Sequence, residues 1–159
     1  MTSHPVTAAE LGGFALFQGL PVEERATLAA AARWREPVDG AVLYDEDGPA
    51  TTMFLIERGQ VTLGVQRDGR RVIVGTLGPG EVLNWSCLRD EPVSLTTART
   101  AGSARLVAIP ADALLALLES GRPAGLTVMR RLFSVAAIHL DAARDQMLRQ
   151  GREGVITAG

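Results

Sequence analysis

Hydrophobic and polar positions divide the chain into three regions with different periodicities. In the first region, the Thr-Ala-Ala-Glu string at 7–10 has the form of a capping box and precedes apolar residues at helical spacing. Pro21 then opens an alanine-rich segment that extends to about Ala32, and proline suits the first position of a helix. The pattern therefore predicts two short helices at the N-terminal end.

Between Arg33 and about Pro110, glycine, proline and β-branched residues replace alanine. Asp68-Gly69 stands between two valine-containing segments and has the form of a two-residue hairpin turn, because both positions tolerate positive φ. Many short segments separated by turn residues favour a barrel or sandwich over a parallel α/β sheet. The predicted strands are 41–44, 53–57, 61–65, 72–77, 96–101 and 105–109.

Helical periodicity returns after Pro110. A leucine-rich helix is predicted over 111–120, closed by Gly121, and a long helix from Pro123 to about Gln150. Apolar residues in the long helix follow a spacing of three and four, which forms a heptad seam. The seam packs either onto the barrel or against a second copy, and we favour a parallel dimer because a helix this long, at ~1.5 Å per residue, outreaches a small barrel. The seam residues are Leu126, Met129, Phe133, Ala136, Leu140, Ala143 and Met147.

Composition places these elements in one domain. The chain has 159 residues, of which 47% are hydrophobic and 21% are charged, so a single core can be filled. We expect one domain over 1–150, with a β-roll at about 33–110 and the long helix at about 123–150, followed by a flexible tail at 151–159. Because no apolar run approaches ~20 residues and no signal peptide is visible, we expect a cytoplasmic protein without a membrane partner.

Charge and candidate chemistry argue against several function classes. Sixteen basic residues, all of them arginine, and 18 acidic residues give a net charge of −2, whereas DNA-binding domains usually carry a basic excess. One cysteine and two separated histidines supply no disulfide, metal or haem constellation. The chain has no nucleophile elbow, P-loop or dinucleotide fingerprint, so we do not expect an enzyme.

Glycine corners with apolar neighbours follow one another in an order that is specific as a set. They are LFQGL at 16–20, VDG at 38–40, Gly48, FLIERGQV at 54–61 and LGPGE at 77–81. Tight corners of this kind favour glycine, since a Cβ would strain them. Over about 14–147 the chain resembles the cyclic nucleotide-binding domain of the catabolite-activator (CRP/FNR-like) group of bacterial regulators. The resemblance implies an α+β, mainly β fold: a double-stranded β-helix or jelly-roll barrel, flanked by short N-terminal helices and a long C-terminal dimerisation helix.

The phosphate-binding segment implied by this resemblance departs from the family pattern. Relatives show Phe-Gly-Glu-x-x-Leu there and a later Arg; the Glu binds the ribose and the Arg pairs with the cyclic phosphate. In this chain LNWSCL occupies 83–88, so Asn84 replaces the Gly, Trp85 replaces the Glu, and Val93 or Ser94 stands at the Arg position. Both charged contacts are missing. The candidate pocket residues are Leu83, Asn84, Trp85, Ser86, Cys87, Ser94, Leu95, Thr96 and His139.

Three interpretations of the pocket remain open. It is filled or vestigial, it takes another small anionic ligand through backbone N–H groups at 84–87, or it takes an ordinary cyclic nucleotide. Trp85 either stacks on a ligand ring or plugs the pocket. Cys87 is more typical of buried filler than of a redox thiol. His139 lies on the helix that borders the ligand in the family, although a position beside the seam is more typical of a solvated side chain.

These observations predict a non-enzymatic regulatory or sensor module with a diverged cyclic-nucleotide-type pocket and no certain cofactor. It is expected to signal through a homodimer and an unknown partner protein. The alternative is a ligand-free structural or protein-interaction scaffold. An open, polar cavity favours the sensor, and an indole packed into an apolar centre favours the scaffold. The WSCL string at 85–88 resembles stand-alone members of the group, and no helix-turn-helix follows the long helix, so we expect no direct DNA binding.

Overall fold

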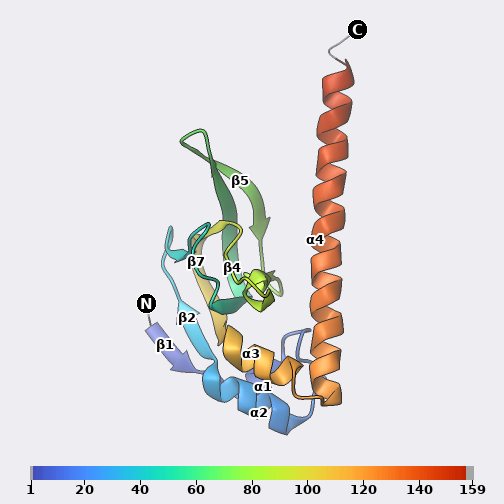
Figure 1. The fold of residues 1–159 in the computed structure, drawn as a ribbon. Helices are drawn as coiled ribbons and strands as arrows, with labels where there is room; N and C mark the ends of the chain where they lie inside the picture. The colour runs from blue at the N-terminus through green and yellow to red at the C-terminus, as the bar shows by residue number, and fades with distance from the viewer. Residues whose placement is uncertain (1, 157–159) are drawn as a thin grey trace.

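The computed structural model of the chain, which describes residues 2–156, consists of a rolled β-sheet, short helices at one end of the roll and one long helix beside it (Figure 1). The elements in chain order are β1 (Thr2–Pro5), α1 (Ala8–Gly12), α2 (Val22–Ala31), β2 (Arg33–Glu36), β3 (Val42–Tyr44), β4 (Thr52–Arg67), β5 (Arg70–Leu77), β6 (Val82–Leu83), the 3-10 helix η1 (Trp85–Leu88), β7 (Thr97–Pro110), α3 (Ala111–Leu118) and α4 (Pro123–Ile156). The predicted α+β, mainly β fold with a long C-terminal helix is confirmed.

All strand pairs are antiparallel, and β4 and β7 form the centre of the seven-stranded sheet. β5 lies beside β4, whereas β2 and then β1 extend the sheet beyond β7. β3 pairs with β7 and β6 with β4, which closes the roll. The sequence analysis did not predict β1, β2 and β6, which are two to four residues long and show little alternation.

Two long strands replace four of the predicted short ones. β4 continues through Gly59 and β7 continues through Gly102, at φ values of 87° and 82°. The β4–β7 ladder shifts register between Ile56 and Gln60, so the strand bulges there without turning. The prediction of separate strands on either side of these glycines is wrong, because a glycine inside a strand can mark a bulge as well as a turn.

The predicted hairpin turn between β4 and β5 is confirmed. Asp68 has φ 52° and Gly69 has φ 72°, as a two-residue hairpin turn requires. The hairpin projects away from the short helices (Figure 1). On β5, Val72, Ile73 and Val74 are all exposed.

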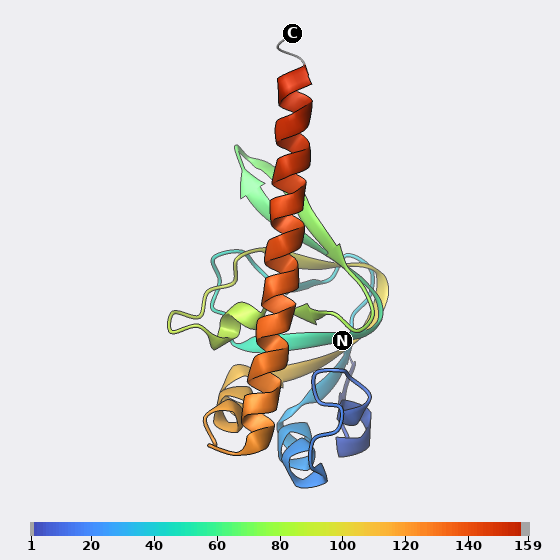
Figure 2. The same cartoon turned by 90° about the vertical axis from the view of Figure 1, so that its right-hand side faces the viewer.

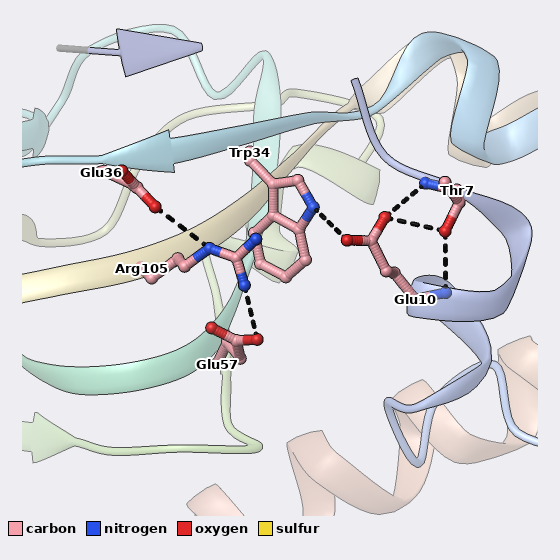
Figure 3. A network of polar contacts seen from close by, with 6 residues as sticks. All are labelled: Thr7, Glu10, Trp34, Glu36, Glu57 and Arg105. Carbon is pink, nitrogen blue, oxygen red and sulfur yellow. Dashed lines mark hydrogen bonds and ion pairs between the residues drawn. The ribbon is translucent and has the colours of Figure 1, made fainter. Parts of the chain in front are cut away.

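The N-terminal helices are joined to the roll by a polar network (Figure 3). The predicted capping box is present, since the Thr7 amide donates to the Glu10 carboxylate at 2.8 Å and the Glu10 amide donates to Thr7 Oγ1 at 3.2 Å. These bonds from Thr7 favour the ionised form and lower the pKa of Glu10. Trp34 Nε1 of β2 donates to the same carboxylate at 3.2 Å, so the cap also holds α1 against the sheet.

Arg105 of β7 completes this network (Figure 3). Its guanidinium lies over the ring of Trp34, 3.6 Å from the centroid, which is cation–π geometry. It forms ion pairs with Glu36 at 3.2 Å and Glu57 at 2.6 Å. The network therefore links three strands to the cap of α1.

Two apolar clusters form the core. The first lies between the helices and the sheet and includes Phe17, Leu114 and Val128 with no exposed surface. The second fills the roll around Ile56 and Leu106, which are also fully buried. Complete burial of such side chains contributes about 1.5–3 kcal/mol each. The base of α4 belongs to the first cluster and is thereby fixed to the body.

Close packing positions the first turns of α4. A Cβ at Gly125 would collide with the carbonyl oxygen of Leu117, so glycine allows α4 to lie against α3. Arg131 donates from Nη1 to the carbonyl oxygens of Leu16 at 3.1 Å and Gln18 at 2.8 Å. These contacts hold the helix beside the loop between α1 and α2.

α4 is longer than the sequence predicts, because it remains helical to Ile156. Residues 151–156 of the predicted flexible tail thus belong to the helix, and 157–159 lie outside the described residues. The helix extends past the roll at its C-terminal end (Figures 1 and 2). This distal part has no counterpart in the body to pack against.

The predicted seam lies on a face of α4 that the body does not cover. Its large side chains are 47–75% exposed, whereas Val128 and Leu132 on the other face are buried. Of the seam alanines, Ala136 is half-buried and Ala143 is exposed. The helix therefore packs onto the body of the protein with residues other than the seam. The first alternative, in which the seam itself packs onto the barrel, does not hold. The exposed large seam residues are Leu126, Met129, Phe133, Leu140 and Met147.

Candidate functional site

A small cavity of about 150 Å³ lies where η1, the inner strands and α4 meet. It brings together most of the predicted pocket residues and adds four that the sequence analysis missed. The predicted residues in its lining are Leu83, Asn84, Trp85, Ser86, Leu95, Thr96 and His139. The added ones are Tyr44, Leu63, Leu77 and Val82. The other two predicted residues, Cys87 and Ser94, are buried and do not line the cavity.

Asn84 organises the backbone at the start of η1. Its φ of 58° and ψ of 34° are left-handed, a conformation that suits glycine or asparagine. The side chain makes three hydrogen bonds: Nδ2 donates to the Thr52 carbonyl at 3.0 Å, and Oδ1 accepts from the hydroxyls of Ser86 and Ser94, each at 3.1 Å. Asparagine in place of the expected glycine therefore preserves the turn and links it to β4.

Trp85 and His139 connect η1 to α4. Their ring centroids are 6.5 Å apart with an interplanar angle of 53°. Both side chains are half-buried, and both line the cavity. Trp85 therefore forms a wall of the cavity without being enclosed in the core. His139, which the sequence interpretation preferred as a solvated side chain, is half-buried and faces the ring of Trp85.

Tyr44 supplies an uncharged hydroxyl to the cavity. Burial raises the pKa of Tyr44 to about 12, although hydrogen bonding to Thr96 and the backbone of Asn84 acts in the opposite direction. The ring stacks on Phe54 with centroids 6.1 Å apart. Tyr44 remains a neutral phenol at physiological pH.

Cys87 is 1% exposed and belongs to the first apolar cluster of the core. Burial raises the pKa of the Cys87 thiol to about 11, so the reactive thiolate is disfavoured at neutral pH. The interpretation of Cys87 as buried filler is confirmed.

The lining contains no arginine, aspartate or glutamate. Arg89 is exposed outside the cavity, and Arg99 Nη1 points to the Gly40 carbonyl at 3.4 Å. Ser94, at one of the two possible positions of the family arginine, has no exposed surface and donates to Asn84. The sequence analysis inferred that the charged contacts to ribose and phosphate are missing, and the lining of the cavity agrees with this inference.

Several concave regions elsewhere are larger, and two of them are bordered by charged side chains that are already paired within the protein. One of about 470 Å³ adjoins the network of Figure 3, where Glu10 and Glu57 are already engaged by Trp34 and Arg105. Another, of about 340 Å³ between α2 and α3, is bordered by an ion pair between Glu24 and Arg122 at 3.3 Å. The small cavity is the one that combines the predicted residues with a contact to α4.

Over residues 2–156, no three His, Cys, Asp or Glu side chains gather where they could hold a metal ion. In the same part of the chain, no helix combines the length and apolar character needed to cross a membrane.

Comparison with known proteins agrees with this architecture. Residues 35–120 match the cyclic nucleotide-binding domain, and the chain belongs to this family. A CRP-like cAMP-activated global transcriptional regulator of Mycobacterium tuberculosis is 28% identical over 103 residues, which cover 62% of this chain. The match covers 45% of that regulator, so the chain spans less than half of its length.

Two solved structures show the same fold. A putative cyclic nucleotide-binding protein from Geobacter metallireducens is 21% identical with a TM-score of 0.75, over 85% of this chain and 98% of that one. The sensor domain of the transcriptional regulator DNR from Pseudomonas aeruginosa is 19% identical with a TM-score of 0.68, over 80% of this chain and 91% of that one. The predicted resemblance to the CRP/FNR-like group is confirmed.

Proposed function

We propose that this chain is a non-enzymatic sensor module whose diverged pocket passes ligand binding to a dimer and to a partner protein. The observation that carries the proposal is that Trp85 of η1 and His139 of α4 line the same cavity and face each other. A molecule bound there touches the helix that carries the exposed seam. Membership of the cyclic nucleotide-binding family, and the regulator and sensor functions named for its relatives, support a regulatory role.

The exposed seam supports the dimer. The large apolar side chains of the seam are 47–75% exposed, so their burial against another surface is energetically favourable. A heptad seam is complementary to a second copy of itself. The C-terminal end of α4 extends past the roll and its hairpin (Figure 1). A shift of η1 against His139 would move α4 relative to the body and thereby change the surface offered to a partner protein.

A ligand-free scaffold is the second candidate function. The observation that favours it is the tight hydrogen bonding of Asn84 with Ser86 and Ser94, which fills the space below η1. The half-buried position of Trp85 favours the sensor, because the indole borders a cavity and does not occupy it. The two functions differ in whether any small molecule binds the cavity.

A thermal-melt titration with cAMP, cGMP and cyclic dinucleotides, with linear AMP as control, tests the family ligand directly. Losing a charge-assisted bond of ~1.5–3 kcal/mol should weaken a cyclic nucleotide by about 10-fold to more than 100-fold. At 100 times Kd a ligand adds about 2.7 kcal/mol and raises the melting temperature by several degrees. We expect no such rise at micromolar cyclic nucleotide. A selective rise at micromolar cAMP or cGMP would show that other groups replace the missing charged contacts.

A further inference from the structure

The cavity is small compared with known ligand pockets. Ligand pockets for drug-sized molecules occupy about 300–1,000 Å³. The present cavity measures about 150 Å³, and an apolar cavity of about that volume accommodates benzene. A cyclic nucleotide contains a base, a ribose and a cyclic phosphate, and therefore belongs to the larger class. A whole cyclic nucleotide is therefore larger than this cavity and would have to extend out of its opening.

The chemistry of the walls points the same way. Leu63, Leu77 and Val82 supply apolar surface from three different strands, and Trp85 supplies an aromatic face. An anion without a cationic partner is costly to bury, and the lining offers no arginine. Among the lining residues, only His139 has a side chain that can carry a positive charge. The walls thus favour an uncharged molecule over a phosphate ester.

The cavity lining also contains a few polar groups that could orient a ligand. The hydroxyls of Tyr44 and Thr96 and the imidazole of His139 reach the lining from β3, from the residue before β7, and from α4. The Ser86 hydroxyl already bonds Asn84, and the Tyr44 hydroxyl is already hydrogen-bonded to Thr96 and to the backbone of Asn84. A ligand would use the remaining hydrogen-bonding capacity of these hydroxyls or replace one of those contacts. Mostly apolar walls with a few placed polar groups are typical of sites for small organic ligands.

We propose that this cavity binds a small uncharged ring compound, about the size of benzene and bearing a hydroxyl or amide group, in place of a cyclic nucleotide. The inference rests on the proposed sensor function and specifies the ligand class of the same site. The ring packs against the indole of Trp85, as aromatic pairs do, and its polar group bonds Tyr44, Thr96 or His139. Bound there, it contacts η1 and α4 together.

Fluorine NMR of protein labelled with 5-fluorotryptophan tests the proposal on the full chain. The two tryptophans give two resonances: Trp85 reports on the cavity, and Trp34, which lies under Arg105, serves as an internal control. A Trp85→Phe variant assigns the signals. The probes are phenol and benzamide as uncharged rings, and cAMP and cGMP as cyclic nucleotides. We expect both uncharged probes to shift the Trp85 resonance saturably and to leave Trp34 unchanged.

A matched pair of variants locates the binding. Leu77→Phe fills the cavity with carbon and adds no charge, so it should weaken the response to phenol at least tenfold. Leu115→Phe makes the same change at a half-buried leucine of α3 outside the cavity and should leave the response intact. An unchanged Trp34 resonance shows that each variant is folded. An equal response of the two variants would overturn the cavity as the binding site.

The outcomes separate the ligand class from the sensor function. A saturable shift of Trp85 with cyclic nucleotides but not with the uncharged rings would overturn the proposed ligand class and leave the sensor standing. No shift with any probe would overturn both proposals and favour the scaffold. A shift with phenol and benzamide that Leu77→Phe abolishes supports both.

Discussion

Replacing Leu140 with Asp is expected to convert the proposed dimer into monomers. Leu140 is 70% exposed on the isolated chain and stands near the middle of the seam. Burying one leucine contributes about 1.5–3 kcal/mol, and a two-fold seam loses that contribution twice. The dimer should therefore weaken by about 3 kcal/mol or more, which is about 100-fold in Kd. Light scattering coupled to size-exclusion chromatography measures the change in mass.

Ile138→Asp is the matched control. Ile138 is 66% exposed, lies on the same helix and stands outside the seam, so the same apolar-to-acidic change is made at nearly equal exposure. This variant should remain dimeric. If both variants have the same mass as the wild type, the seam is not the dimer contact. If both become monomeric, the effect comes from added charge on α4 and not from the seam.

Gly59→Ala is expected to lower the free energy of unfolding more than Gly40→Ala does. The residue sits in the β4 bulge at φ 87°, where an L side chain costs about 1–3 kcal/mol. A Cβ there would lie 2.6 Å from the Ser103 carbonyl oxygen and 2.7 Å from the Cα of Ala104, both backbone atoms of β7. Crowding of this kind costs about 1–3 kcal/mol more. Urea unfolding followed by circular dichroism should show a total loss of about 2–6 kcal/mol.

Gly40→Ala separates the two costs. Gly40 also has positive φ, 71°, but nothing lies within 4 Å of its added Cβ. It should lose only the conformational part, about 1–2 kcal/mol. Both variants are compared with the wild type at one protein concentration, since a dimer's stability depends on concentration. Equal losses at the two positions would contradict the close approach of β4 and β7 at the bulge.

Local patterns were sufficient for the helices and the turn chemistry. The capping box at Thr7, the hairpin at Asp68-Gly69 and the heptad spacing of α4 each depend on residues close in sequence, and the structure shows all three. The bulges at Gly59 and Gly102 were not predicted, because a local pattern does not show whether a partner strand continues past a glycine. Strand pairing decides that question.

The pocket residues that lie in one chain segment were predicted, whereas those that other strands bring to the cavity were missed. Asn84, Trp85 and Ser86 are neighbours in the chain, so the resemblance located them together. Tyr44 and Leu63 come from other strands, and only the closure of the roll brings them to the cavity. Nothing in the sequence around these two residues distinguishes them from ordinary alternating strand positions.

A ligand in the cavity is expected to change the contact between η1 and α4. Hydrogen–deuterium exchange of the wild-type protein, measured with phenol and separately with cAMP, detects this change. We expect a bound ligand to slow exchange both at 83–88, which includes η1, and at 132–142, the part of α4 around His139. Protection confined to 83–88, or no protection with either ligand, would show that the cavity is not coupled to α4.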